Sequence, residues 1–292
     1  MSGTPVYITA NNGSPVNITG AGAGSIPISG IAAPVGSVPD QQLIVGPTSN
    51  LIAAPGFFSS VLISSALPFV MAPTGTMGNN GAITMGTALE FTYPNCYVAL
   101  PAGAIATGIP AASAWYYCVM SSSTVGTVYN NTYGSGSGQP TIPASPTPFV
   151  TTGPGAFTGI TSGSFRMQSY SLPAGTLGIR DSLRVCARYS NNNTSGNKTL
   201  ATVFGANILG IFVGSSIKSV SITTIISNRE ATNSQIGVVN TSNGFGGTST
   251  SDYSVSTIDT TMAALLEIAC TRATATDTIV AESFMVELLK GS

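Results

Sequence analysis

From about residue 56 onward, the chain is built of short apolar runs that alternate with clusters of glycine, proline, asparagine and serine. The runs show no helical period, and short strands joined by frequent turns are typical of β-sandwiches and β-barrels. Examples of these runs are SSVLIS (59–64), LPFVM (67–71), LEFTY (89–93), CYVAL (96–100), WYYCVM (115–120) and TVYNNTY (127–133). The sequence therefore predicts an all-β fold.

Longer segments of alternating apolar and polar residues follow, at 164–173, 181–190, 197–205 and 216–227. A period of two predicts strands with one buried face. The turn residues NNNTSGN (191–197) predict a hairpin between the second and third segments. Segments 261–272 and 278–289 predict a closing hairpin, which we favour over a short helix at 261–272. The basic residues Arg184, Arg188, Lys198 and Arg272 are expected on the solvent-exposed faces of strands, where charge discourages edge pairing.

The N-terminus holds a small repeat, in which PVYIT (5–9) recurs as PVNIT (15–19) after the turn residues ANNGS. This pattern predicts a hairpin, and its apolar residues Val6, Ile8, Val16 and Ile18 are candidate anchoring residues. The following segment, 20–39, has little side-chain volume with which to form a core. We therefore expect 1–55 to be an extended arm that becomes ordered against neighbouring subunits.

The remaining chain, 56–292, is expected to form one β-sandwich or two, the two being 56–160 and 161–292. The segment 135–155 is rich in proline and glycine, so it is either a linker or a long surface loop.

Charge is scarce and unevenly placed. Only 7% of the residues are charged, against roughly 25% in ordinary soluble domains. All nine lysines and arginines lie from Arg166 onward, so clustered cations for a nucleic-acid partner are not expected. The formal net charge of −1 gives little repulsion between copies, which suits a protein that works inside an assembly.

The residue types that usually carry catalysis or bind metals are few. There is no histidine, and Cys96, Cys118, Cys186 and Cys270 are widely spaced, so we expect buried free thiols and no metal site. The carboxylates are isolated along the chain, and Glu282 and Glu287 are expected on opposite faces of one strand. The sequence therefore predicts a protein that is not an enzyme and needs no cofactor.

No basic segment followed by an apolar one stands near Met1, so no signal peptide is expected. The uncharged runs 51–72 and 200–217 are interrupted by prolines, serines or glycines. We expect both to be buried strands joined by turns rather than membrane spans.

The segment AWYYCVMSSSTVGTVYNNTYGSG (114–136) concentrates aromatic residues and has two interpretations. In the first, Trp115, Tyr116, Tyr129 and Tyr133 form a stacking platform for a glycan, with Asn130 and Asn131 as hydrogen-bonding neighbours. In the second, the segment is a buried strand pair whose aromatic side chains fill a core and contact a neighbouring subunit. We favour the second, because both faces of the first strand are apolar.

Segments 114–136, 140–157 and 170–205 resemble stretches of tailed-bacteriophage virion structural proteins of the head-fibre, decoration and tail-fibre type. In the third segment, the turn LPAGTLG (172–178) precedes an alternating strand and an NKTL strand that ends in FG. The resemblance covers about 90–290. It implies a jelly-roll-like antiparallel β-sandwich, often trimeric, with no catalytic residues to carry over.

Together these observations predict a virion surface protein, a capsid decoration or fibre that assembles in the cytoplasm of the bacterial host. Its partners would be copies of itself, as a homotrimer, and the major capsid or tail proteins that receive the arm. The alternative is a tail-fibre module that recognises a glycan on the host surface. A tailspike that degrades polysaccharide would need clustered carboxylates, which the sequence does not display.

Overall fold

The structure is a computed structural model that describes residues 7–9, 15–17, 59–65, 67–101, 114–133, 140–149, 154–161, 165–192, 194–241 and 253–291. The chain divides into two compact units, Met1–Pro39 and Asp40–Ser292. Within the described ranges, the regular structure is β-strand apart from one 3₁₀ turn at Asn79–Gly81. The prediction of an all-β fold is confirmed.

The first unit contains the hairpin that the N-terminal repeat predicts. Strands β1 (Tyr7–Thr9) and β2 (Pro15–Asn17) pair in antiparallel fashion, and Ile8 lies opposite Val16. The other two candidate anchoring residues, Val6 and Ile18, lie outside the described residues.

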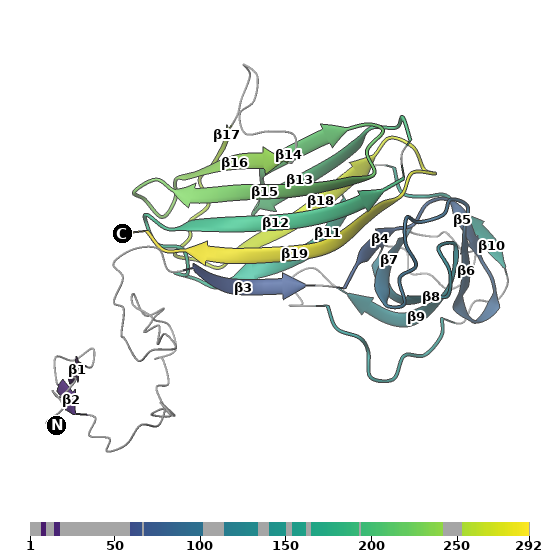
Figure 1. The fold of residues 1–292 in the computed structure, drawn as a ribbon, viewed down its shortest axis with the longest axis horizontal. Coiled ribbons are helices and arrows are strands. Elements are labelled where there is room, and N and C mark those ends of the chain that lie inside the picture. Colours follow the sequence, from purple (N-terminus) through teal and green to yellow (C-terminus); the bar gives the residue numbers. More distant parts are fainter. Residues whose placement is uncertain are drawn as a thin grey trace, which may run out of the picture. The chain divides into compact units, whose positions relative to one another are not determined.

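The second unit contains a sandwich of two sheets (Figure 1). One sheet runs in the order β19-β12-β15-β16-β17, and the other in the order β11-β18-β13-β14. The strands are β11 (Phe165–Leu172), β12 (Ser182–Asn191), β13 (Lys198–Phe204), β14 (Asn207–Gly214), β15 (Ser219–Asn228), β16 (Gln235–Thr241), β17 (Tyr253–Ser256), β18 (Ala264–Arg272) and β19 (Ile279–Leu289). Along β15, Val220, Ile222 and Ile226 are buried and alternate with polar or less buried neighbours, as a strand with one buried face requires.

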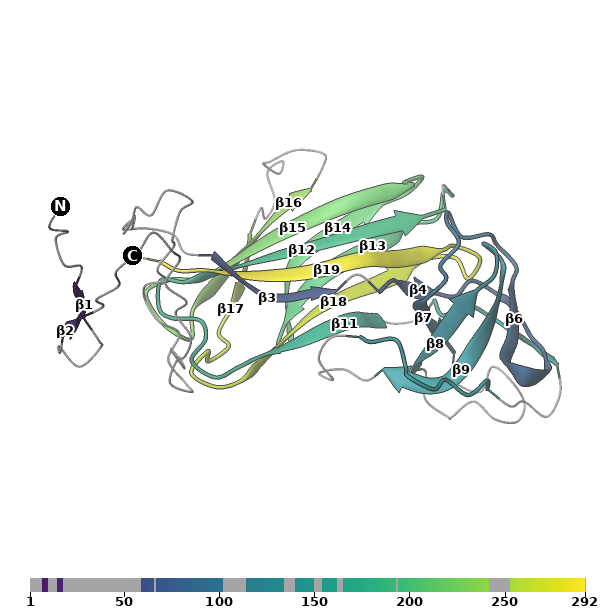
Figure 2. The same cartoon turned by 60° about the horizontal axis from the view of Figure 1, so that its bottom comes forward.

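The larger sheet continues beyond β19 into a curved extension, in the order β4-β7-β8-β9-β6-β5-β10 (Figures 1 and 2). Its strands are β4 (Phe69–Met71), β5 (Gly75–Met77), β6 (Ala82–Met85), β7 (Cys96–Leu100), β8 (Ala114–Met120), β9 (Val125–Tyr133) and β10 (Gly155–Phe157). Strand β19 pairs with β4 through Ile279–Ala281 and with β3 (Ser59–Ser65) through Phe284–Leu289. The pairing of β4 with β7 is parallel, which departs from the expected antiparallel arrangement.

Two apolar cores lie on opposite faces of the extension. Tyr97, Trp115 and Tyr117 belong to the core that fills the sandwich, which we call the sandwich core. Their neighbours along the same strands, such as Val98 and Tyr116, belong to a separate extension core with Met77, Ile83, Val128 and Phe157. The extension is therefore attached to the sandwich both by the continuous sheet and by a shared core.

Two predicted hairpins are wrong. Strand β12 pairs with β15 and β19, whereas β13 pairs with β14 and β18, so the turn at 191–197 joins different sheets. Strands β18 and β19 also lie in different sheets. The physical reason is that alternation shows which face of a strand is buried but not which strand pairs with it. Both connections pass from one sheet of the sandwich to the other.

The predicted run LEFTY (89–93) is an irregular segment rather than a strand. Leu89 and Tyr93 are buried, and backbone hydrogen bonds to Ser123 and Met120 hold the segment in place. Of the proline-rich segment 135–155, the structure describes 140–149 and 154–155. Pro148 forms an isolated β-bridge with Tyr129 of β9, and Phe149 N–H donates to Val128 O over 2.9 Å. In the uncharged runs, 59–65, 69–71, 198–204 and 207–214 are strands, and no described helix is long and apolar enough to cross a membrane.

Candidate functional site

The predicted aromatic residues lie at the junction between the extension and the sandwich. Phe69 of β4 is at the centre, and its ring centroid lies 4.9 Å from that of Trp115 and 5.1 Å from that of Tyr133, both in edge-to-face geometry. Trp115 and Tyr133 are buried, and Trp115 Nε1 donates a hydrogen bond to Arg166 O over 2.7 Å. These side chains fill the junction, and burial raises the pKa of Tyr133.

Tyr116 points to the opposite face of the same strand. It is fully buried in the extension core, where its ring lies edge-to-face with Phe149 at a centroid distance of 5.6 Å. Its hydroxyl has no hydrogen-bond partner among the described residues, and burial raises its pKa. Successive side chains of 115–120 thus lie in two different cores, as expected for a strand whose two faces are both apolar.

The other predicted contact residues have some exposed area. Tyr129 is half-buried with its ring tilted against Tyr117 at 5.5 Å, Asn130 is exposed, and Asn131 is half-buried. The structure therefore does not bring the four aromatic residues together on one surface. Trp115, Tyr116 and Tyr133 are buried within the chain itself, which leaves Tyr129, Asn130 and Asn131 as the residues of this set that a glycan or a subunit could contact.

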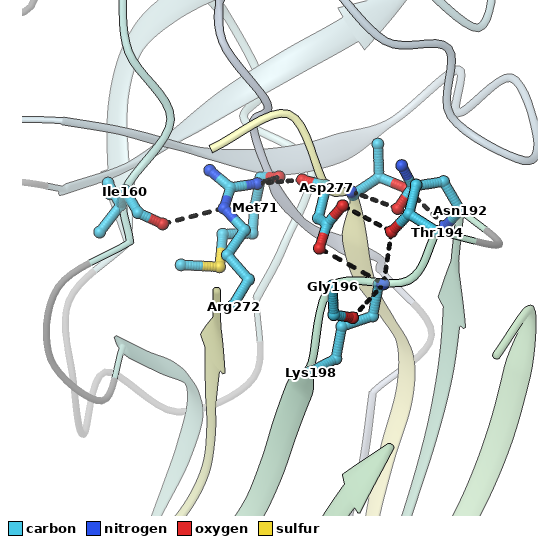
Figure 3. A network of polar contacts seen from close by, with 9 residues as sticks. Met71, Ile160, Asn192, Thr194, Gly196, Lys198, Arg272 and Asp277 are labelled. Atoms are coloured by element: carbon cyan, nitrogen blue, oxygen red, sulfur yellow. Dashed lines mark hydrogen bonds and ion pairs between the residues drawn. The ribbon is translucent and has the colours of Figure 1, made fainter. Parts of the chain in front are cut away.

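A buried polar network joins the extension to the sandwich, and Figure 3 shows it from close by. Its first part is the guanidinium of Arg272, at the end of β18, which donates to the carbonyl oxygens of Met71, Ala72, Ile160 and Asp277. Burial lowers the pKa of Arg272 to about 10. One side chain thus donates hydrogen bonds to carbonyl groups from three segments and holds these segments together. We call this arrangement the Arg272 clamp.

The second part of the network is an ion pair with almost no solvent exposure. Lys198 Nζ donates to Thr194 Oγ1 over 2.9 Å and to Gly196 O over 3.1 Å, and lies 3.5 Å from Asp277 Oδ2. Thr194 Oγ1 in turn donates to Asp277 Oδ1 over 2.6 Å (Figure 3). Asp277 Oδ2 has no hydrogen bond among the described residues. An amine and a carboxyl group are therefore held side by side and away from water.

The prediction that Lys198 and Arg272 lie on exposed faces is wrong, since both are fully buried. Each stands at the end of a strand beside one of the two connections between the sheets. Asn192 and Thr278, one from each connection, exchange hydrogen bonds of 2.8 Å. Little in the sequence indicates that these two residues are buried. The only hint is a lysine and an arginine next to polar loops in a chain with few charges.

An open hollow lies on the outer face of the sandwich, lined by Phe91, Arg188, Tyr189, Ser190, Ser219, Val220, Ser221 and Glu282, with a volume of about 400 Å³. Glu282 Oε1 accepts hydrogen bonds from the hydroxyls of Tyr93 and Ser190. Burial and the bond to Glu282 raise the pKa of Tyr93. Among the described residues, no salt bridge joins Arg188 to a carboxylate, and the ring of Phe91 is exposed.

Glu282 reaches this hollow because of a β-bulge. Ser283 lies opposite Arg188 and Ala281 lies opposite Tyr189, which leaves Glu282 as an extra residue in β19. Glu287 pairs with Arg184, which shares a face of β12 with Arg188. Glu282 and Glu287 thus lie on the same side of the sheet, and the expectation of opposite sides is wrong because it assumed a regular strand.

The cysteines are free thiols, three of them buried and Cys186 half-buried. Cys96 and Cys118 lie opposite each other on β7 and β8, and this contact together with burial raises the pKa of Cys96 well above its ordinary value. Such thiols are poor nucleophiles. In the part of the chain that the structure describes, no three histidine, cysteine or acidic side chains are close enough to hold a metal ion.

No protein-family model matches the chain, and no curated protein matches its sequence.

Proposed function

We propose that the chain is a non-enzymatic structural protein on the surface of a bacteriophage particle, a capsid decoration or fibre anchored by its N-terminal arm. The resemblance of 114–136, 140–157 and 170–205 to virion proteins supports the class. The observation that carries the proposal is an apolar strand, β14, which is open to association with a second copy of the chain.

Strand β14 is at the end of its sheet and contains no charged residue and no proline. Its side chains Ile208, Ile211 and Val213 are 47%, 51% and 56% exposed. Soluble proteins usually protect edge strands with charges, prolines or bulges, because an open edge pairs with other chains. Strand β14 has one bulge, at Leu209, but neither of the other two protections. Contiguous exposed apolar side chains are typical of protein interfaces, and Ile211 and Val213 lie on one face of β14. In a homotrimer, a neighbouring copy supplies hydrogen-bond partners to the edge of β14 and covers its exposed apolar side chains.

The test is the molar mass of the purified protein, measured by light scattering during size-exclusion chromatography. The wild type should be a trimer, and the double variant Ile211→Lys with Val213→Lys should be a monomer of unchanged circular dichroism. Ile142→Lys is the matched control, since Ile142 is 55% exposed but lies in an irregular segment, and it should stay trimeric. A monomeric wild type, or a trimeric double variant, would contradict the role of β14.

The arm is tested separately. Deletion of 1–40 should leave a folded protein that no longer joins phage particles, because the arm supplies the anchor. Incorporation of the shortened protein into particles would contradict this part of the proposal.

A second candidate, a receptor-recognition module that binds a host glycan, is favoured by the hollow beside Phe91. Sugars stack their C–H faces on exposed aromatic rings, and carboxylate and guanidinium groups hydrogen-bond their hydroxyls; the hollow has Phe91, Glu282 and Arg188. Phe91→Ala should then abolish adsorption of the phage to its host while particles still assemble. Normal adsorption of that variant would remove this candidate and leave the structural role.

A further inference from the structure

The pair of Lys198 and Asp277 has an arrangement that suits covalent bond formation between the two side chains. Lys198 begins β13, and Asp277 lies in the connection from β18 to β19. Their side chains are 0% and 1% exposed, and Nζ lies 3.5 Å from Oδ2. Reactive groups fixed in contact behave as if present at very high concentration, so a slow reaction between them is accelerated.

The reaction starts from the neutral form of the pair, a free amine beside a carboxylic acid. Two buried ions lose their hydration, and passing the proton from the ammonium to the carboxylate removes both charges at once. Oδ2 of Asp277 accepts no hydrogen bond from the described residues, and Lys198 Nζ lies 3.5 Å from it. The other charged group nearby, Arg272, donates to the backbone oxygen of Asp277 and also interacts electrostatically with the Asp277 carboxyl group.

Thr194 provides a route for the proton that must leave the amine. Its Oγ1 lies 2.9 Å from Lys198 Nζ and 2.6 Å from Asp277 Oδ1 (Figure 3). The hydroxyl can therefore accept a proton from nitrogen while it gives its own to the carboxyl oxygen. Gly196 closes the site, because a Cβ at that position would lie 2.3 Å from Asp277 Oδ2.

We infer that Lys198 and Asp277 condense to form an intramolecular amide bond, which makes the pair a self-modification site. The neutral amine adds to Cγ of the carboxylic acid, and its proton passes through Thr194 to Oδ1. The resulting gem-diol expels one hydroxyl, which leaves as water with the proton of the other. One C–N bond forms and one C–O bond breaks, with no change in oxidation state and no other reactant.

Such a bond would lock β13 to the segment that precedes β19, across the edge where the two sheets meet. It would also remove the cost of two buried charges. A permanent cross-link in this position suits a protein that must keep its fold without a cofactor, although the inference does not depend on the proposed function.

The test is the mass of the intact, denatured wild-type protein after folding and prolonged incubation. The expected mass is lower than that of the sequence by one water molecule. A tryptic digest should contain residues 189–218 joined to 273–290, because the modified Lys198 is no longer cleaved. An unchanged mass with both peptides separate would overturn the inference without any variant.

Four variants identify the groups. Lys198→Arg and Asp277→Ala should each show the full mass of their sequences, whereas Asp277→Asn should lose ammonia instead of water. Thr194→Val should slow the loss of water during refolding by tenfold or more, since it keeps the shape and removes the proton route. Loss of water that persists in both Lys198→Arg and Asp277→Ala would place the reaction elsewhere and overturn the assignment.

Discussion

The ring of Phe69 lies edge-on to the indole of Trp115, with the ring centroids 4.9 Å apart. Phe69 is on β4, the strand of the extension that pairs with β19. Trp115 is on β8, which pairs with β7 in the extension. Tyr97 and Tyr133 complete the contacts of Phe69, at 5.3 and 5.1 Å. The aromatic cluster is therefore where the extension meets the sandwich core.

Replacement of Phe69 by alanine should destabilise the protein strongly. The side chain is fully buried, and the loss of a buried phenylalanine costs about 3–5 kcal/mol of the free energy of unfolding. Urea unfolding followed by fluorescence of the single tryptophan measures the change. The control is Phe91→Ala, which should change stability by about 0.5 kcal/mol or less because its ring is 57% exposed. Equal effects of the two variants would contradict the central position of Phe69.

Tyr129 and Tyr133 should respond differently to replacement by alanine. Tyr133 is buried between Phe69 and Tyr97, so its loss should cost about 3 kcal/mol, whereas the half-buried Tyr129 should cost less. The comparison by urea unfolding also separates packing from glycan binding. If Tyr133→Ala kept full stability and lost only host adsorption, the packing interpretation of 114–136 would fail.

Replacement of Arg272 by methionine should destabilise the junction between the extension and the sandwich. A buried carbonyl left without a hydrogen-bond donor costs about 1–3 kcal/mol, and Met71, Ala72 and Ile160 all accept from this guanidinium. The expected loss is about 3 kcal/mol or more by chemical denaturation. Arg180→Met is the control, since its ion pair with Glu230 is exposed and worth about 0–1 kcal/mol. A loss at Arg272 no larger than at Arg180 would exclude the clamp.

Alkaline pH should unfold the protein cooperatively. Burial raises the pKa of the Cys270 thiol from 9.0 to about 12, and it also raises the pKa of Tyr97, Tyr116 and Tyr133 above the ordinary value of 10.0. A proton held more tightly in the folded state adds stability, which is complete below the unfolded-state pKa and is lost as the pH rises through the folded-state pKa. These groups should lower the free energy of unfolding from about pH 9 upward.

Arg272 acts in the opposite direction. Its folded-state pKa is lowered from 12.5 to about 10, so the folded state loses this proton first and its contribution to stability rises above pH 10. More of these groups have a raised pKa than a lowered one, so the net effect of alkaline pH is a loss of stability. Urea unfolding at stepped pH, together with the absorbance of tyrosinate, measures the effect. If the buried tyrosines ionised at their ordinary pKa while the protein stayed folded, the predicted alkaline unfolding would be contradicted.

The fold class could be predicted because alternation reports burial directly. In 115–120, apolar residues on both faces of one strand indicated a strand buried on both sides, and the structure places those faces in two cores. The pairing of β8 with β9 followed from their closeness in sequence and the short turn between them. Local patterns of this kind depend on residues that are near one another along the chain.

The strand neighbours and the buried network could not be predicted. The turns at 191–197 and 273–278 have the composition of hairpin loops, yet each crosses between sheets, because the choice of partner depends on packing across the core. For the same reason Lys198 and Arg272 could not be recognised as buried: their partners Asp277 and Met71 are distant in sequence. The bulge at Glu282 likewise depends on the register of two long strands.

The most direct test of the proposed virion role is immunogold electron microscopy of purified phage particles with an antibody against residues 161–292. Label on the particles is expected: gold over the heads would identify a decoration or head fibre, and gold on the tails would identify a tail fibre. Absence of label from every particle, with an antibody that binds the purified protein, would contradict the proposed virion role.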